Sequence, residues 1–189
     1  MKKIIYFIEF ILIKILFFIF KFIGYKFSSN LGFLIGIFFG PLFKSKKQII
    51  KNLEKANIQK PQNLKKIASN ILGNYGRILA EYVHLEDFRN DKLKKYISIE
   101  GLEHLYYLKK SKKKAVFISG HFNNFELMAM QIEKAGIELA AIYRPLNNVF
   151  LNKTMEKIRI ENICKNQIKK GRAGSREIIK NVKSGKSIE

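Results

Sequence analysis

The sequence of 189 residues has no tryptophan, one cysteine and three histidines. A single cysteine, Cys164, cannot form a disulfide within the chain. Cys164 also has no cysteine or histidine near it at the spacing of a zinc site. We therefore expect no metal site, and nothing in the sequence suggests a cofactor.

Acidic residues are also scarce, with 15 Asp and Glu against 36 Lys and Arg, for a net charge of +21. Such an excess favours anionic partners, either nucleic acid or an acidic membrane surface. The charge is accompanied by no recognised nucleic-acid-binding motif. A basic nucleic-acid-binding protein therefore stays open as the non-enzyme alternative, supported by charge alone.

The most apolar part of the chain is residues 1–43. Within it, Ile4–Phe20 contains only two charged residues, Glu9 and Lys14, and a second apolar stretch, Leu31–Phe43, is interrupted by glycines. A membrane-spanning helix needs about 20 apolar residues. We expect this part to be a helical segment that attaches the chain to a membrane.

The lysines of this segment suggest how it could lie. Lys3, Lys14 and Lys21 are spaced so that they fall within about 20° of one another on a helix. Such a stripe is typical of a helix in the membrane interface, but the pattern does not explain Glu9 and leaves spanning and surface attachment open. Excess lysine between residues 44 and 47 predicts that the remainder stays on the cytoplasmic side.

From residue 44 onward, predicted helices alternate with predicted strands. The helices are expected over 48–56, 61–84, 101–113, 150–162 and 175–183, with one more after Glu126, and strands over 96–100, 115–118 and 138–143. Strands separated by helices predict an α/β domain over residues 44–189, with a mostly parallel sheet flanked by helices. Another strand should be starting where the sequence stops, so we expect the sheet to be incomplete.

The predicted helix over 61–84 contains two glycines and a histidine. Gly73 and Gly76 weaken a helix, so they predict either a close contact with a neighbouring element or a kink. His84, near the end of the helix, is expected at the surface, where it would interact with the helix dipole.

The stretch Ala115–Glu126, AVFISGHFNNFE, contains the strongest candidate site. Its apolar run 115–118 predicts a buried strand, and the Ser119-Gly120 pair predicts a break after that strand. Open α/β folds bind their ligands at the carboxyl edge of the sheet. His121, directly after the break, is therefore placed where chemistry is usually done.

His121 and Glu126 can meet only if the chain breaks between them. On one continuous helix they would lie about 140° apart, so His121 must lie in a loop and Glu126 in the first helical turn. Asn123 and Asn124 supply that break, because asparagine caps helices and tolerates left-handed backbone angles. The alternative is a capping box, with Asn123 as the cap, Glu126 as the third helical residue and a purely structural histidine.

The block Gly120–Glu126, GHFNNFE, resembles the G-H-F-G-N-W-E block of the bacterial lipid A biosynthesis acyltransferases. These enzymes belong to the glycerolipid acyltransferase superfamily, whose signature is His-x4-Asp/Glu. Asn123 stands where the family has glycine and Phe125 where it has tryptophan. Further blocks agree in order along essentially the whole chain, namely Asn52-Leu53, Asn74–Arg77 with Glu81, Glu100–Glu103, Tyr143–Pro145 and Lys169–Arg172. Family members extend past the position of Glu189, so we expect this chain to be the N-terminal part of such an enzyme.

The resemblance implies transfer of a fatty acyl group from acyl carrier protein to a hydroxyl of a lipid A precursor, at the cytoplasmic face of the inner membrane. It implies that His121 is the general base and that Glu126 orients it. Arg144 could bind a phosphate, or it could be an ordinary surface arginine. A basic cluster could bind lipid A phosphates or the acidic carrier protein, or be a solvated face; it comprises Lys169, Lys170, Arg172 and Arg176. A lysophospholipid or glycolipid acceptor, and an inactive truncated remnant, are the alternatives within the superfamily.

Overall fold

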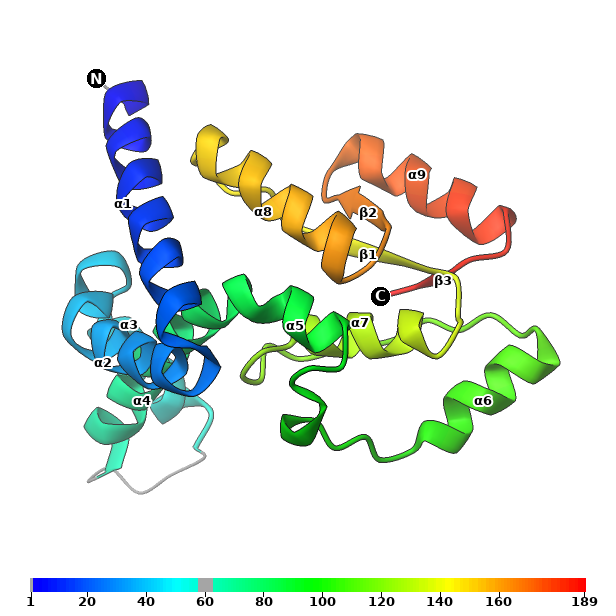
Figure 1. Cartoon of the computed structure of the whole chain (residues 1–189), viewed down its shortest axis with the longest axis horizontal. Helices are drawn as coiled ribbons and strands as arrows, with labels where there is room; N and C mark the ends of the chain where they lie inside the picture. Colours follow the sequence, from blue (N-terminus) through cyan, green and yellow to red (C-terminus); the bar gives the residue numbers. More distant parts are fainter. Residues whose placement is uncertain (1, 58–62) are drawn as a thin grey trace. The chain divides into compact units, whose positions relative to one another are not determined.

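The computed structural model describes residues 2–57 and 63–189. These residues form two compact units (Figure 1). One unit is Lys14–His84, and the other is Leu85–Glu189 together with residues 2–13. The first unit is helical where it is described, and the second contains the sheet.

The unit Lys14–His84 follows the predicted helices closely. Its elements are the second half of α1 (Lys2–Ile23), α2 (Tyr25–Phe43), α3 (Lys46–Lys55), α4 (Leu64–Glu81) and the short 3-10 helix η2 (Tyr82–His84). The helices predicted over 48–56 and 61–84 are confirmed as α3 and α4, although the predicted start of the second lies outside the described residues. The boundary predicted between residues 43 and 44 falls inside this unit; it concerns membrane attachment and stays a prediction.

α2 and α4 pack with their backbones in direct contact, through glycines on both helices. A Cβ atom added to Gly32 would lie 2.6 Å from the carbonyl oxygen of Gly76, and one added to Gly36 would lie 2.9 Å from the Cα of Gly73. Only glycine permits such an approach, because any side chain would push the helices apart. The close contact predicted from Gly73 and Gly76 is confirmed.

His84 lies inside this unit, so its predicted surface position is wrong. Its Nε2 atom lies 3.0 Å from the Ser28 hydroxyl oxygen and 3.2 Å from the carbonyl oxygen of Phe20. A carbonyl oxygen can only accept, and the Ser28 hydroxyl donates to the Tyr25 carbonyl, so Nε2 is the nitrogen that carries the proton. These hydrogen bonds to distant residues satisfy the ring nitrogen, so the imidazole can be buried. The interaction with the helix dipole depends only on local sequence and does not predict them.

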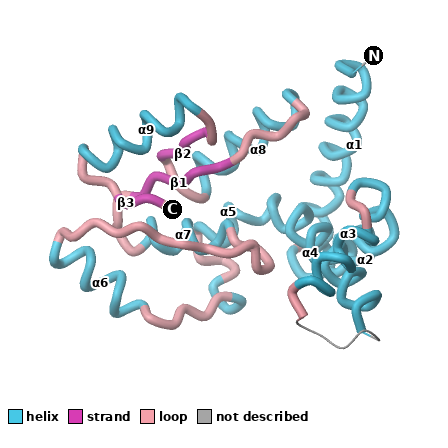
Figure 2. The backbone as a smooth tube through the Cα atoms, turned by 180° about the vertical axis from the view of Figure 1, so that it is seen from behind, coloured by secondary structure: helices cyan, strands magenta, loops and turns pink. Residues whose placement is uncertain are grey.

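The second unit alternates helices and strands from α7 (Glu126–Lys134) onward (Figure 2). After the first half of α1 it contains α5 (Leu85–Arg89), η3 (Lys94–Tyr96), α6 (Leu102–Ser111), α7 (Glu126–Lys134), β1 (Leu139–Tyr143), α8 (Val149–Asn162), β2 (Asn166–Lys169), α9 (Arg172–Lys183) and β3 (Ser187–Ile188). The helices predicted over 101–113, 150–162 and 175–183 are confirmed as α6, α8 and α9. The helix predicted after Glu126 is confirmed as α7, and the strand over 138–143 as β1.

The three strands form one open sheet in the order β2-β1-β3, and both pairs are parallel. α9 packs on one face of the sheet through Ile178. Tyr143 of β1 points to the other face, where the guanidinium of Arg159 of α8 lies 5.2 Å from the centre of its ring. The predicted α/β fold, with a parallel sheet flanked by helices, is confirmed; the sheet is small, and helix predominates.

The strand predicted over 115–118 is reduced to a single parallel bridge between Val116 and Ile188. β3 is two residues long, so its partner can form no longer ladder. Val116 and Ile118 are 74% and 91% exposed. The predicted burial of this run is therefore wrong, although its position beside a parallel strand is right.

The strand predicted over 96–100 does not form. Tyr96 ends the 3-10 helix η3, and the residues after it have no regular structure. Ile97 and Ile99 line a cavity beside α7. The alternating pattern is therefore real, but its apolar side chains line a cavity wall without any pairing to a neighbouring strand.

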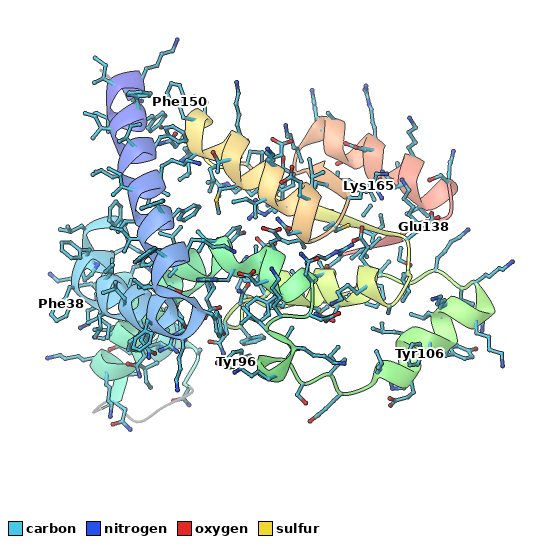
Figure 3. All side chains as sticks on the ribbon, in the orientation of Figure 1. Phe38, Tyr96, Tyr106, Glu138, Phe150 and Lys165 are labelled. Carbon is cyan, nitrogen blue, oxygen red and sulfur yellow. The ribbon has the colours of Figure 1, made fainter. Side chains whose placement is uncertain are left out.

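The first half of α1 packs on the N-terminal end of α8. The side-chain amide of Asn148 donates to the Tyr6 carbonyl oxygen at 2.8 Å and to Glu9 Oε2 at 2.9 Å. Its oxygen accepts from the backbone N–H groups at the start of α8, so one side chain caps α8 and holds α1. Phe7 packs edge-on against Phe150, with ring centres 5.6 Å apart; Phe150 is labelled in Figure 3. These contacts explain Glu9, which the lysine stripe does not.

Exchanging Gly32 for alanine tests the α2–α4 contact. A methyl group there would meet the backbone of Gly76, whereas the same change at Gly40 would meet only the Leu72 side chain, at 3.1 Å. Both changes raise helix propensity by about 1 kcal/mol, so their difference isolates the contact. We expect Gly32→Ala to lower the free energy of unfolding by about 2 kcal/mol relative to Gly40→Ala, measured by denaturation in mild detergent. Equal stabilities would contradict the close contact.

Candidate active site

A cavity of about 410 Å³ lies at the carboxyl ends of the strands. Its walls include His121 from the loop before α7, Glu126 from the first residue of α7, Arg144 directly after β1 and Lys170 directly after β2. His121 therefore lies at the carboxyl edge of the sheet. Four of the residues predicted for the site meet in one cavity, although they come from three separate parts of the chain.

The loop before α7 places His121 and Glu126 on different backbone segments. Asn123 has φ +48°, in the left-handed region that glycine favours, which explains why asparagine can stand where the family has glycine. α7 begins at Glu126, and its cap position, Phe125, makes no side-chain capping hydrogen bond. The capping-box alternative is wrong, because it requires Asn123 as the cap and Glu126 one turn further along.

Glu126 is held by Arg159 of α8. Its Oε1 atom accepts from Nε of Arg159 at 3.0 Å and from Nη2 at 2.8 Å. Both side chains are nearly buried, where a charge is costly unless it is paired and hydrogen-bonded. The ion pair therefore fixes the position of the carboxylate in the cavity wall.

The imidazole of His121 is exposed to the cavity and packs on Phe125. The two ring centres lie 4.2 Å apart, with the planes tilted by 46°. Phenylalanine thus supplies the aromatic packing that tryptophan would supply at this position in the family. His121 and Glu126 share one cavity, and their pairing in catalysis stays a prediction.

The predicted substrate-binding residues separate into three groups. Arg144 and Lys170 line the cavity. Lys169 forms an ion pair with Glu156 of α8, with Nζ 2.9 Å from Oε1. Arg172 and Arg176 lie exposed on the first turns of α9. Two of the five predicted substrate-binding residues therefore line the cavity. The substrate-binding role of all five stays a prediction.

Charges in and beside the cavity perturb one another. Burial, together with the Glu126 carboxylate, raises the pKa of Glu189, which also lines the cavity, to about 7. Burial and the neighbouring Glu156 carboxylate raise the pKa of Tyr143. The Lys169 ammonium lowers the pKa of Glu156. Glu189 therefore lies where a second negative charge is unfavourable, because burial and the Glu126 carboxylate both oppose it.

Cys164 has the properties of a structural thiol. It is fully buried and donates to the Leu139 carbonyl oxygen at 3.1 Å. Burial raises the pKa of its thiol to about 11, so it is no nucleophile at neutral pH. Within residues 2–57 and 63–189, no group of three or more His, Cys, Asp or Glu side chains could hold a metal ion.

The family model of the bacterial lipid A biosynthesis acyltransferases matches residues 1–189. The chain belongs to this family. A search of curated proteins and a search of solved structures gave no significant match. The resemblance drawn from the block Gly120–Glu126 is thereby confirmed, and the cavity that contains His121 and Glu126 becomes the candidate active site of a lipid A biosynthesis acyltransferase.

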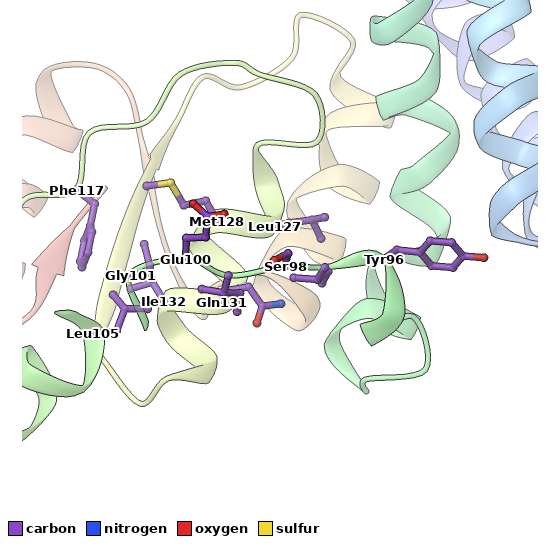
Figure 4. A pocket seen from close by; sticks show the side chains of 12 residues that line it. Tyr96, Ser98, Glu100, Gly101, Leu105, Phe117, Leu127, Met128, Gln131 and Ile132 are labelled. Atoms are coloured by element: carbon purple, nitrogen blue, oxygen red, sulfur yellow. The ribbon is translucent and has the colours of Figure 1, made fainter. Parts of the chain in front are cut away.

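Two features of this acyltransferase are missed by sequence reasoning. One is the role of Arg159, which lies in the last turn of α8, where a basic residue is expected for the helix dipole alone. The other is a second cavity, of about 450 Å³, on the far side of α7 (Figure 4). Leu127, Met128 and Ile132 line it from α7, whereas Glu126 and Ala129 face the first cavity. α7 thus forms a wall shared by a charged cavity and a largely apolar one.

Replacing Arg159 tests the ion pair. Arg159→Met keeps a long side chain but leaves the buried Glu126 carboxylate without this cation. Breaking a buried pair costs about 3 kcal/mol, so we expect the free energy of unfolding to fall by that amount at pH 7. The matched change Arg176→Met, on an exposed face, should cost no more than about 0.5 kcal/mol. If both variants lose a similar free energy of unfolding, the ion pair does not stabilise the fold.

Proposed function

We propose that this chain transfers a fatty acyl group from the thioester of acyl carrier protein to a hydroxyl of a lipid A precursor. The observation that carries the proposal is the cavity in which His121 and Glu126 stand together with Arg144 and Lys170, in a chain of the lipid A biosynthesis acyltransferase family. An accessible histidine, a carboxylate and two cations match a reaction between a lipid alcohol and an activated acyl group.

His121 acts as the general base. An alcohol is a weak nucleophile until a base removes its proton, and a neutral imidazole is suited to this task near pH 7. The oxygen attacks the thioester carbonyl carbon, so a C–O bond forms and the C–S bond breaks. The proton taken up by His121 then passes to the departing thiolate, which leaves as a thiol and returns the imidazole to its neutral form.

Glu126 orients the imidazole and stabilises its protonated form. A carboxylate can accept about four hydrogen bonds, so the two bonds from Arg159 are compatible with a further one from His121. Arg159 acts through Glu126 as a positioning residue, because it holds the carboxylate at the start of α7. This division of labour is the one known from hydrolase triads, where an acid orients the base.

Arg144 and Lys170 bind the anionic part of the substrate. They stand at the carboxyl ends of adjacent strands β1 and β2, so their charges add at one side of the cavity. Arginine can bind a phosphate through two parallel hydrogen bonds. Lys169, Arg172 and Arg176 lie nearby in sequence and supply a basic surface for the phosphates of the lipid or for the acidic carrier protein.

The enzyme acts at the cytoplasmic face of the inner membrane, where its residues 1–43 attach it. Among the described residues, α2 is long and apolar enough to cross a membrane, judged by length and composition. A basic surface beside an apolar segment favours an anionic leaflet, in which a lipid acceptor is concentrated.

Changing His121 to alanine should reduce acyl transfer by at least a hundredfold, because a positioned base contributes about 10²–10⁴-fold. Transfer is measured with acyl carrier protein thioester and a lipid A precursor in membranes that contain the protein. His104→Ala is the matched control, because that imidazole is exposed on α6, outside the cavity. Substantial turnover by His121→Ala would rule out the base role.

The same assay tests Glu126 and the acceptor. Glu126→Gln should slow the reaction with little change in KM, since it affects the transition state more than binding. Lysophospholipid and glycolipid acceptors are offered in parallel, and product analysis shows which one is acylated. A wild-type chain that acylates none of them would support the inactive alternative.

Neutralising Arg144 should weaken substrate binding. A hydrogen bond to a charged group contributes about 1.5–3 kcal/mol, so we expect Arg144→Gln to raise KM about tenfold or more, with a smaller change in kcat. Lys180→Gln, on the exposed part of α9, removes the same charge outside the cavity. If both variants raise KM equally, the effect belongs to net charge and Arg144 has no specific role.

A further inference from the structure

α2 carries its small residues inside and its large apolar residues outside. Its buried residues are Ser28, Ser29, Gly32 and Gly36. The large side chains that are more than half exposed are Phe27, Leu34, Phe38, Phe39, Leu42 and Phe43. Phe38, which is labelled in Figure 3, is 72% exposed. A soluble helix shows the opposite arrangement, so this outer face requires an apolar environment.

The inner face of α2 is covered by α4 and η2 from its first turn to its last. Near the start, Ser28 contacts His84 at 3.0 Å. In the middle, Gly32 lies against the backbone of Gly76, and near the end Gly40 lies against Leu72. α2 therefore cannot enter the hydrocarbon of a membrane along its whole length unless α4 goes with it or these contacts break.

α4 is unsuited to hydrocarbon. It carries Lys65, Lys66 and Arg77, and the Arg77 guanidinium lies over the ring of Phe33 of α2, 4.6 Å from its centre. Arg77 lies more than one turn from either end of α4, and a charge inside the hydrocarbon of a bilayer is costly. The buried side chain of Glu81, at the end of α4, accepts a hydrogen bond from the Ser29 hydroxyl at 2.7 Å, and it is equally unsuited to hydrocarbon. α2 therefore cannot cross a membrane without bringing the charged side chains of α4 into the hydrocarbon.

α1 is also unable to cross. Its first half is held by Asn148, which donates to the Tyr6 carbonyl oxygen and to Glu9. The second half, residues 14–23, would rise by only about 15 Å at 1.5 Å per residue. The hydrocarbon core of a bilayer is about 30 Å thick, so this half reaches at most its middle.

We propose that α2 lies in the plane of a single leaflet of an anionic phospholipid bilayer and does not cross the membrane. Its phenylalanine face lies among the acyl chains, and Lys26 and Lys44, near its two ends, lie at the level of the headgroups, where lysines are stabilised. The proposal rests on the membrane attachment proposed above, and it decides between the spanning and the surface arrangement that the sequence leaves open.

Cysteine labelling of the full chain tests the arrangement. In a Cys164→Ser background, Lys26→Cys places a thiol in the first turn of α2, and Lys47→Cys places one beyond its other end, in the first turn of α3. A membrane-impermeant maleimide is added to spheroplasts and to inverted membrane vesicles. We expect both thiols to react in inverted vesicles and neither in spheroplasts. Reaction of Lys26→Cys only in spheroplasts, or in neither preparation, would overturn the proposal and leave the acyltransferase function intact.

Flotation with phosphatidylglycerol vesicles tests the occupant of the outer face. Phe38→Gln with Phe43→Gln should lower binding about tenfold or more, because both substitutions remove apolar surface that would be buried among the acyl chains. The control pair Tyr106→Gln with Tyr107→Gln removes two exposed aromatic rings from α6 and should bind like the wild type. If the double phenylalanine variant floats like the wild type, but the wild type is a dimer in solution and the variant is a monomer, a second copy of the chain covers this face. That result would overturn the proposal. Wild-type protein that does not float would overturn both this proposal and the membrane attachment.

Discussion

The ion pair between Glu126 and Arg159 is the interaction on which the candidate site depends. It joins the first residue of α7 to α8, two helices separated in the chain by β1. Two buried charges repay their desolvation only when the geometry is good, and here two donors of one guanidinium converge on one carboxylate oxygen. The start of α7 is thereby fixed, and with it the loop that carries His121. The proposed chemistry needs a carboxylate that does not move.

The contact between α2 and α4, in the unit Lys14–His84, follows a different constraint, because it is made of small and polar groups. Glycine backbones meet between α2 and α4, and serine hydroxyls contact His84 and Glu81 at one end. Apolar side chains gather on the outer face. A contact of this kind gains little from the hydrophobic effect, so close backbone packing and hydrogen bonds stabilise it, while the outer face of α2 suits a lipid environment.

Local pattern predicts much of the fold and part of the site. The helices α4, α6, α8 and α9 follow their apolar spacing, and Asn123 adopts the left-handed angle that its place in the family block requires. The strand at 115–118 shrinks to one bridge because its partner β3 is short. The alternating apolar residues over 96–100 line a cavity and form no strand. The period of the pattern alone cannot distinguish a cavity wall from a strand. His84 is buried by α2, which lies more than 40 residues away in the sequence.

By itself the sequence determined the family, the order of the elements and the placement of His121 in a loop before a helix, because these depend on spacing between near neighbours. Only the tertiary structure decided which groups hold the polar side chains. Glu126 meets Arg159 across 33 residues, and Glu9 meets Asn148 across 139. Such partners are chosen by how helices and strands pack in space, and the free energy of that packing is spread over many contacts that no local pattern encodes.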